Sequence, residues 1–306
     1  MPKRDFLSID DLSRDELESL VASAATIKDD PSSVDGALAG RQVALVFEKP
    51  STRTRVSFEV AVEQMGGHAV VLRGDELQLG RGETIEDTGR VLSRYVDCIC
   101  VRTFGHDRLD RLAAASTVPV VNALSDFSHP CQALADVQTI FEHRSRSDDI
   151  TLAYFGDGNN VAHSLMFAGT KLGFDVRIAS PPGYEPDDAV MERCQKLAAE
   201  SGGKIVVTGD AAGAAAGADV LYTDVWASMG QESEAEERKR TFVRYQVNED
   251  LLALAAGDAI VMHCLPAHRG EEIDAAVIDG VHSVVWDQAE NRLHAQKALL
   301  AWLLRP

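Results

Sequence analysis

The chain has 306 residues, 45% of them hydrophobic, which is enough for two domains with buried cores. It lacks a run of about 18 apolar residues, and its N-terminal segment lacks the apolar core of a secretory signal, so we expect no membrane span and a cytoplasmic location. The formal net charge of −18 argues against a nucleic-acid partner, because phosphate contacts require a basic surface.

Apolar runs alternate with amphipathic segments along the first half of the chain. Ser13 and Glu16 form a capping-box pattern, and Ser51 stands where a helix N-cap is expected. This half predicts strands at 41–47, 68–72, 96–102 and 118–124, and helices at 14–28, at 52–65 and from about Pro130 onward.

A polar stretch at 143–149 is the best candidate for a linker, and the alternation resumes after it. The second half predicts strands at 150–155, 174–179, 204–208, 218–223, 259–263 and 284–286, and helices at 161–172, 187–200 and about 288–304. We therefore expect an α/β protein of two domains, 1–142 and 143–287, each with a mainly parallel sheet flanked by helices.

Polar residues gather after the predicted strands, where open parallel sheets bind their ligands. Ser51-Thr52-Arg53-Thr54-Arg55 opens the predicted helix 52–65. A helix start offers unpaired N–H groups and partial positive charge, to which this segment adds three hydroxyls and two guanidiniums. The pattern predicts a phosphate site, and a capped helix with two surface arginines is the alternative.

Other polar residues stand at equivalent places in the predicted sheets. Arg102 ends an otherwise apolar strand, and His129 and Gln132 lie one turn apart at a helix start. Asp224 and Cys264 each follow a predicted strand in the second half. We expect these groups to converge on one cleft between the domains.

The segment from Gly156 to Val161 invites a dinucleotide-binding interpretation, which is weak. The third fingerprint position is Val161, and the following strand ends without an acid for a ribose hydroxyl. Histidines and cysteines near 129–131 and 263–268 match no zinc spacing. We therefore expect no nucleotide, no metal and no other cofactor.

The charged residues and cysteines also bear on the host and compartment. Only 8 of the 30 basic residues are lysines, and an acidic, lysine-poor surface favours a halophilic host, although an ordinary acidic enzyme is the alternative. The five cysteines include no C-x-x-C pair, which predicts free thiols in a reducing compartment.

Five motifs in this order resemble ornithine carbamoyltransferases. They are STRTR at 51–55, VRTFGH at 101–106, HPCQ at 129–132, DVWASMG at 224–230 and HCLP at 263–266. STRTR and HPCQ mark carbamoyltransferases in general, whereas the SMG segment together with HCLP indicates the ornithine branch. The matching segments extend from about 41 to 297, nearly the whole chain.

The resemblance implies transfer of the carbamoyl group of carbamoyl phosphate to the side-chain amine of L-ornithine. Arginine biosynthesis is the expected pathway, and the reverse reaction in arginine breakdown is the alternative that the sequence leaves open. It implies that the first domain binds carbamoyl phosphate and the second binds ornithine. It further implies that the last helix, within 288–306, packs back on the first domain, and that the chain forms trimers or multiples of trimers.

The same resemblance assigns the site residues. The expected catalytic residues are Arg102, His129 and Cys264. The expected carbamoyl phosphate contacts are Ser51, Thr52, Arg53, Thr54, Gln78 (from a neighbouring chain), Arg102, His129, Pro130, Cys131, Gln132, Cys264, Leu265 and Arg292. The expected ornithine contacts are Asn160, Asp224, Ser228 and Met229.

Alternatives remain open at this point. Asp224 can hold either the α-ammonium or the side-chain amine, and Cys264 can orient the amine or attack covalently. The nearest rival function is a carbamoyltransferase for aspartate, putrescine or an acylated ornithine. An NAD-dependent oxidoreductase and a catalytically inactive binding protein are rivals of other classes.

Overall fold

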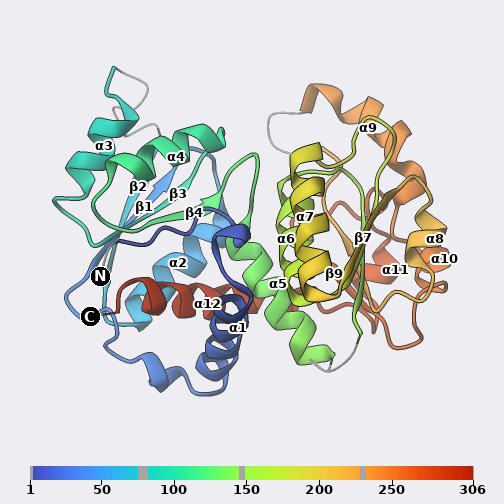
Figure 1. The fold of residues 1–306 in the computed structure, drawn as a ribbon, viewed down its shortest axis with the longest axis horizontal. Helices are drawn as coiled ribbons and strands as arrows, with labels where there is room; N and C mark the ends of the chain where they lie inside the picture. Colours follow the sequence, from blue (N-terminus) through green and yellow to red (C-terminus); the bar gives the residue numbers. More distant parts are fainter. Residues whose placement is uncertain (1–2, 75–81, 145–148, 228–231, 306) are drawn as a thin grey trace. The chain divides into compact units, whose positions relative to one another are not determined.

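The computed structural model describes residues 3–74, 82–144, 149–227 and 232–305 (Figure 1). The chain forms two compact units: unit 1 comprises residues 1–138 and 290–306, and unit 2 comprises residues 139–289. These divisions fall inside two helices, whereas the sequence predicted limits after residues 142 and 287. Within the described ranges, no helix is long and apolar enough to cross a membrane.

Unit 1 is built on a sheet of four parallel strands in the order β2-β1-β3-β4. The strands are β1 (Gln42–Phe47), β2 (His68–Arg73), β3 (Cys98–Arg102) and β4 (Val120–Leu124). Its helices are α1 (Arg14–Asp29), α2 (Thr52–Gln64), α3 (Ile85–Leu92) and α4 (His106–Ala115), joined by α5 (Pro130–His143) and α12 (Val285–Leu303), which cross the limits of the unit.

Helices cover both faces of this sheet (Figure 1). On one face, Ile85 of α3 and Leu109 of α4 pack against Val101 and its neighbours. Helices α2 and α12 lie on the other face. Because a parallel sheet is buried on both sides, β1 and β3 are nearly continuous apolar runs, as predicted. The Ser13–Glu16 capping box that starts α1 is also confirmed.

Unit 2 is built on a sheet of five parallel strands in the order β7-β6-β5-β8-β9. The strands are β5 (Thr151–Phe155), β6 (Asp175–Ala179), β7 (Lys204–Thr208), β8 (Val220–Thr223) and β9 (Ile260–His263). Its helices are α6 (Asn160–Leu172), α7 (Asp188–Ser201), α8 (Ala211–Ala215), α9 (Ala235–Phe242), α10 (Glu249–Leu252) and α11 (Ala275–Ile278).

The strand orders locate the ligand-binding edge of each sheet. In unit 1 the chain runs from β1 outward to β2 and then returns to β3 on the other side of β1. In unit 2 it runs from β5 through β6 to β7 and returns to β8 on the other side of β5. Ligands of open α/β sheets bind beyond the strand ends where the order reverses, that is, after β1 and β3 and after β5 and β8.

The predicted strand at 284–286 is wrong. Val285 begins α12, and within the described residues only Ser283 forms a bridge there, with Val261. A short apolar run suits a buried helix as well as a strand, so the periodicity could not decide. The helix places Gln288 where its side chain accepts from the His263 N–H at 2.9 Å and donates to the Tyr222 hydroxyl at 3.0 Å.

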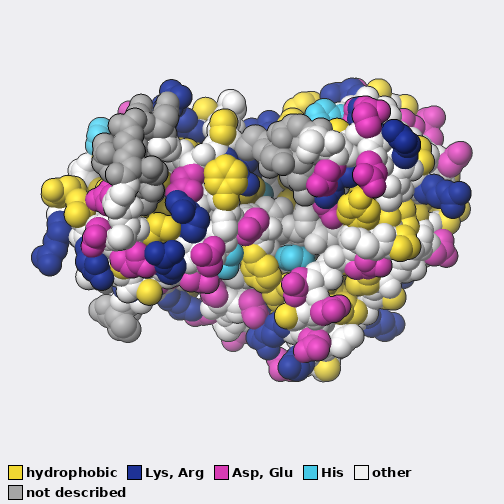
Figure 2. Space-filling model, turned by 90° about the horizontal axis from the view of Figure 1, so that it is seen from above, with side chains coloured by type: hydrophobic (Ala, Val, Ile, Leu, Met, Phe, Trp, Pro, Cys, Tyr) yellow, Lys and Arg dark blue, Asp and Glu magenta, His cyan; other side chains and the backbone are white. Residues whose placement is uncertain are grey.

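Charged side chains cover the surface of both units. Acidic side chains are scattered over the face seen in Figure 2, with lysines and arginines among them. Surface pairs such as Arg14–Glu18 at 2.9 Å and Arg269–Asp279 at 2.6 Å add little stability each, because water screens them.

Candidate active site

The start of α2 forms the first part of the site in unit 1. Ser51 follows β1 and caps the helix, with its hydroxyl accepting from the Thr54 N–H at 3.3 Å, as the sequence predicted. Thr52 and Arg53 are exposed, whereas Thr54 is buried. The first turn therefore presents backbone N–H groups and a guanidinium outward, which is the arrangement that binds anions.

A buried arginine from the other end of the chain joins this turn. Arg292 of α12 is 3% exposed, and its Nη2 donates to Thr54 Oγ1 at 2.9 Å. Its Nη1 donates to Gln132 Oε1 at 2.6 Å and lies 3.4 Å from His129 Nε2. Gln132 in turn donates to Asp136 at 2.8 Å. Residues from α2, α5 and α12 thus form one hydrogen-bonded cluster, which we call the cradle (Thr54, His129, Gln132 and Arg292).

His129 is the titratable member of the cradle. Burial lowers the pKa of His129 well below its usual value, and the positive charges of Arg292, Arg102 and Arg53 lower it further. These three arginines therefore lie close enough to act on one imidazole. At neutral pH the ring is therefore uncharged. It keeps one N–H group, which can donate a hydrogen bond to a developing oxyanion.

The lowered pKa gives a testable pH dependence. The ring should stay neutral at pH 6, so its NMR shifts should not move between pH 8 and pH 6. In the unfolded chain His129 titrates near pH 6.5. Below that pH only the unfolded state gains the proton, so this residue should reduce stability as the pH falls, by at most about 1.4 kcal/mol per pH unit. A His129→Gln variant should lose that part of the slope, and an unchanged slope would contradict the assignment.

Lys49, two residues before Ser51, is a further cation after β1 that the sequence pattern did not assign to the site. Burial lowers the pKa of Lys49, and the nearby charge of Arg102 lowers it further. Its ammonium lies 4.1 Å from the centroid of the Phe104 ring. The adjacent Glu48 accepts from Thr103 at 2.7 Å and Arg108 at 2.9 Å, so its negative charge is already balanced. A cavity of about 730 Å³ opens here and is lined in part by Lys49, Ser51 and Thr52.

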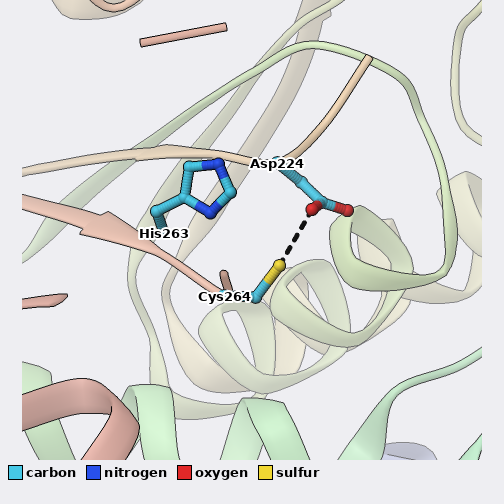
Figure 3. Close-up of side chains that lie close together, drawn as sticks. All are labelled: Asp224, His263 and Cys264. Carbon is cyan, nitrogen blue, oxygen red and sulfur yellow. Dashed lines mark hydrogen bonds between the residues drawn. The ribbon is translucent and has the colours of Figure 1, made fainter. Parts of the chain in front are cut away.

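Asp224 is the centre of the candidate site in unit 2. It follows β8, is 6% exposed and accepts hydrogen bonds on both carboxylate oxygens. Cys264 donates to Oδ1 at 2.9 Å and Asn159 donates to Oδ2 at 3.0 Å. Figure 3 shows the Cys264 thiol pointing at this carboxylate. Cys264 follows β9, the neighbour of β8 in the sheet, which explains the contact.

The ring of His263 lies beside Asp224 and Cys264 (Figure 3). Its Nδ1 accepts from the Leu265 N–H at 2.8 Å, so the proton sits on Nε2, which lies 3.0 Å from the buried carboxylate of Glu272. Ligating atoms of Asp224, His263 and Cys264 lie within 4.8 Å of one another, as a metal site would require. Because both ring nitrogens of His263 bond to other protein groups, the imidazole fits neither a metal ligand nor a base for the thiol.

The glycines of the turn after β5 serve packing within the chain. Gly156 has a φ of +136°, a conformation that side chains disfavour. A Cβ on Gly158 would lie 2.2 Å from the backbone nitrogen of Pro186. Asn159 then caps α6, accepting from the N–H groups of Val161 and Ala162. This accounts for the glycine pattern without a nucleotide.

The predicted site residues fall into three groups. Ser51, Thr52, Arg53, Thr54, Arg102, His129, Pro130, Cys131, Gln132 and Arg292 belong to unit 1, and Asn160, Asp224, Cys264 and Leu265 belong to unit 2. Gln78, Ser228 and Met229 lie outside the described residues. The Cys131 thiol donates to Asn122 O at 3.4 Å, and burial raises its pKa to about 12, so only the backbone of Cys131 is suited to a ligand contact.

Fold and site together define an α/β protein of two units, with an arginine-bearing cluster at a helix start in one unit and a carboxylate–thiol pair in the other. A family model for the carbamoyl-P binding domain of aspartate/ornithine carbamoyltransferases matches residues 4–142, and one for the Asp/Orn binding domain matches residues 148–303. This chain belongs to the aspartate/ornithine carbamoyltransferase family.

Individual relatives agree with this assignment. The ornithine carbamoyltransferase of Parafrankia sp. is 60% identical over 307 residues, covering 99% of this chain and 97% of that protein. The protein named "Ornithine carbamoyltransferase, anabolic" from Pyrococcus furiosus is 55% identical over 303 residues, covering 98% and 96%. The solved structure of ornithine carbamoyltransferase from Pyrococcus furiosus has a TM-score of 0.94 and 56% identity, covering 98% of this chain and 96% of that one.

Proposed function

We propose that the chain transfers the carbamoyl group of carbamoyl phosphate to the side-chain amine of L-ornithine, giving L-citrulline and phosphate. The observation that carries the proposal is the cradle at the start of α2, where buried Arg292 joins Thr54, Gln132 and His129. The likeness to ornithine carbamoyltransferases over nearly the whole chain supports the acceptor.

In this proposal unit 1 holds carbamoyl phosphate. The phosphate binds to the N-terminal turn of α2, where Ser51, Thr52, Arg53 and Thr54 supply N–H groups, hydroxyls and charge. Arg102, His129 and Gln132 reach the carbamoyl group, and Arg292 holds the cluster together. We also assign contacts with this substrate to Gln78 of a neighbouring chain, to Pro130 and Cys131 at the start of α5, and to Cys264 and Leu265 after β9.

Unit 2 holds ornithine in this proposal. An amine like that of lysine has a pKa near 10.4, so only about 0.1% is uncharged at pH 7.5. The Asp224 carboxylate attracts the charged amine, and the Cys264 thiol beside it can orient the nitrogen after a proton leaves. Asn160 at the start of α6 is assigned to ornithine, together with Ser228 and Met229.

The reaction follows from these positions. The neutral amine attacks the carbamoyl carbon, and the carbonyl oxygen becomes an oxyanion stabilised by Thr54, Arg102 and His129. The carbon–oxygen bond to phosphate then breaks, and the leaving phosphate takes the electron pair and accepts the proton that the amine nitrogen loses. The turn of α2 and Arg53 stabilise the phosphate as it leaves.

Metal removal should leave the activity unchanged. The proposed steps use arginine, imidazole and backbone donors, and both nitrogens of His263 already have protein partners. The protein is dialysed against a chelator, and elemental analysis confirms that the dialysed protein is free of metal. Its rate of citrulline formation should then equal that of the untreated enzyme. A loss of activity that added Zn²⁺ or Mg²⁺ restores would show that the proposed mechanism is wrong.

The decisive test is citrulline formation from carbamoyl phosphate and ornithine. Aspartate, putrescine and an acylated ornithine serve as competing acceptors in parallel assays. If any of these acceptors reacts faster than ornithine, then that acceptor, and not ornithine, is the substrate. Running the assay in low and in high salt also tests a halophilic origin, which we infer from 48 acidic residues against 30 basic ones.

We further propose a cytoplasmic enzyme of arginine biosynthesis that assembles as a trimer or a multiple of trimers. The pathway is supported by the anabolic relative from Pyrococcus furiosus. The assembly rests on the assignment of Gln78 to a neighbouring chain, and sedimentation of the purified protein measures it directly. A monomer with full activity would contradict that role for Gln78.

A further inference from the structure

Arg238 of α9 is a buried arginine in unit 2 outside the proposed substrate contacts. Its side chain is 7% exposed, and its Nη1 donates to Asp157 Oδ2 at 2.7 Å and to the backbone oxygen of Trp226 at 3.0 Å. Its Nε donates to Glu234, one turn earlier in the chain, at 3.0 Å. One guanidinium therefore connects α9 with the turn at Asp157, which is 81 residues earlier in the chain, and with the segment after β8.

Two of these segments are tied directly to Asp224. Asp157 lies in the turn after β5, and two residues later Asn159 donates to Asp224 Oδ2 at 3.0 Å. Trp226 is two residues beyond Asp224. Arg238 thus bonds to Asp157 and to Trp226, one in each of the two segments that hold Asp224 in place. None of these bonds is made to the Asp224 carboxylate itself.

Two aromatic rings, those of Tyr184 and Phe242, pack against the Arg238 guanidinium and hold it in this position. Its central carbon lies 5.0 Å from the centroid of the Tyr184 ring and 6.0 Å from that of Phe242. Phe242 also packs against Tyr184 at 4.8 Å and Trp226 at 6.1 Å between ring centroids. Planar stacking and several donors in one fixed fork are properties of arginine that lysine lacks.

We propose that Arg238 is a positioning residue for the amino-acid acceptor. It holds the 156–159 turn and the backbone at 224–226 in one arrangement, so that Asn159 and Asp224 keep the direction needed to receive ornithine. The inference rests on the proposed function and deepens it. Because the bonds that Arg238 makes to the described residues lie within unit 2, its loss should affect ornithine and leave carbamoyl phosphate binding alone.

Arg238→Lys and Arg238→Met test the inference by steady-state kinetics of the full-length enzyme. We expect the KM for ornithine to rise by about 10- to 100-fold, since small misplacements of binding groups have effects of that size. The KM for carbamoyl phosphate should stay within about twofold of wild type, because the unit 1 cluster is untouched. An ornithine KM within twofold of wild type, or an equal rise in both KM values, would overturn the inference.

Arg144→Gln is the matched control. Arg144 also lies in unit 2 with a side chain only 10% exposed, and it pairs with two carboxylates, Asp219 and Asp258, which precede β8 and β9 at the other end of the sheet. Its loss should lower the melting temperature without changing the ornithine KM. If Arg144→Gln raises the ornithine KM as much as Arg238→Met does, the effect is general destabilisation and the inference fails.

A double variant covers the case in which Arg238→Met does not fold. Arg238→Met with Asp157→Asn removes the buried charge that the single change would leave unpaired. It should fold and still show an ornithine KM raised by about 10- to 100-fold. A normal ornithine KM in the double variant overturns the inference. Wild type that forms no citrulline overturns the proposed function instead.

Discussion

Replacing Arg102 or His129 by alanine should lower kcat by about 10²–10³, because the loss of one oxyanion donor costs about 2.7–4 kcal/mol. The charges of Arg102 and of Arg53, which lies in the first turn of α2, both act on the pKa of His129. In the proposed reaction the carbonyl oxygen gains its full charge only after attack. The donors therefore matter more in the transition state than in the bound substrate, and kcat should fall more than KM rises.

The measurement is the rate of citrulline formation at saturating ornithine and carbamoyl phosphate. Arg111→Ala and His68→Ala are matched controls, since both side chains are exposed on unit 1, at α4 and at the start of β2. These controls should keep kcat within about twofold of wild type, as surface changes usually do. A tenfold loss or less in both Arg102→Ala and His129→Ala would refute their assignment as oxyanion donors.

Local signals were sufficient to predict where α2 begins. Ser51 caps α2 because its hydroxyl reaches the N–H three residues on, a contact within one helical turn. The contact from Arg292 to Thr54 spans 238 residues, and no spacing in the sequence could indicate it. Only the family resemblance suggested Arg292, and the structure adds that the arginine also bonds to Gln132.

The most useful nonlocal guide was the rule that ligands bind beyond the carboxyl ends of the strands in an open parallel sheet. It placed Asp224 and Cys264 after strands that prove to be neighbours in the sheet, and the two side chains share a hydrogen bond. Glu272 and Arg238 gave no comparable signal, because single charged residues in acidic or basic segments are usually solvated. Their burial depends on tertiary packing that the sequence pattern does not reveal.

Helices were the least predictable elements. Helices α3 and α4 lie between predicted strands at 68–72 and 118–124 and were not assigned. Segments α8, α10 and α11 have only 5, 4 and 4 residues, too few to show a helical period. These short helices are stabilised by packing on the unit 2 core, where Ala215, Leu251 and Val277 are buried.

Asp224→Asn should lower kcat/KM for ornithine by at least about 30-fold, since the loss of one partner of a buried charged pair costs about 2–5 kcal/mol. The amide keeps the size of the side chain but removes the charge that attracts the amine. In the wild type, Cys264 Sγ and Asn159 Nδ2 each donate a hydrogen bond to a carboxylate oxygen of Asp224. In the variant, the NH₂ group of the new amide faces one of these two donors and cannot accept its hydrogen bond.

Two further measurements locate this effect in unit 2. The affinity for a stable phosphonate analogue of carbamoyl phosphate, measured by calorimetry, should match wild type, because the cradle belongs to unit 1. Asp175→Asn is the matched control: Asp175 starts β6 at the opposite end of the same sheet and pairs with Arg177 at 2.9 Å. If kcat/KM for ornithine falls no further in Asp224→Asn than in Asp175→Asn, then Asp224 does not bind the acceptor, and the amine must find its counter-charge elsewhere in the protein.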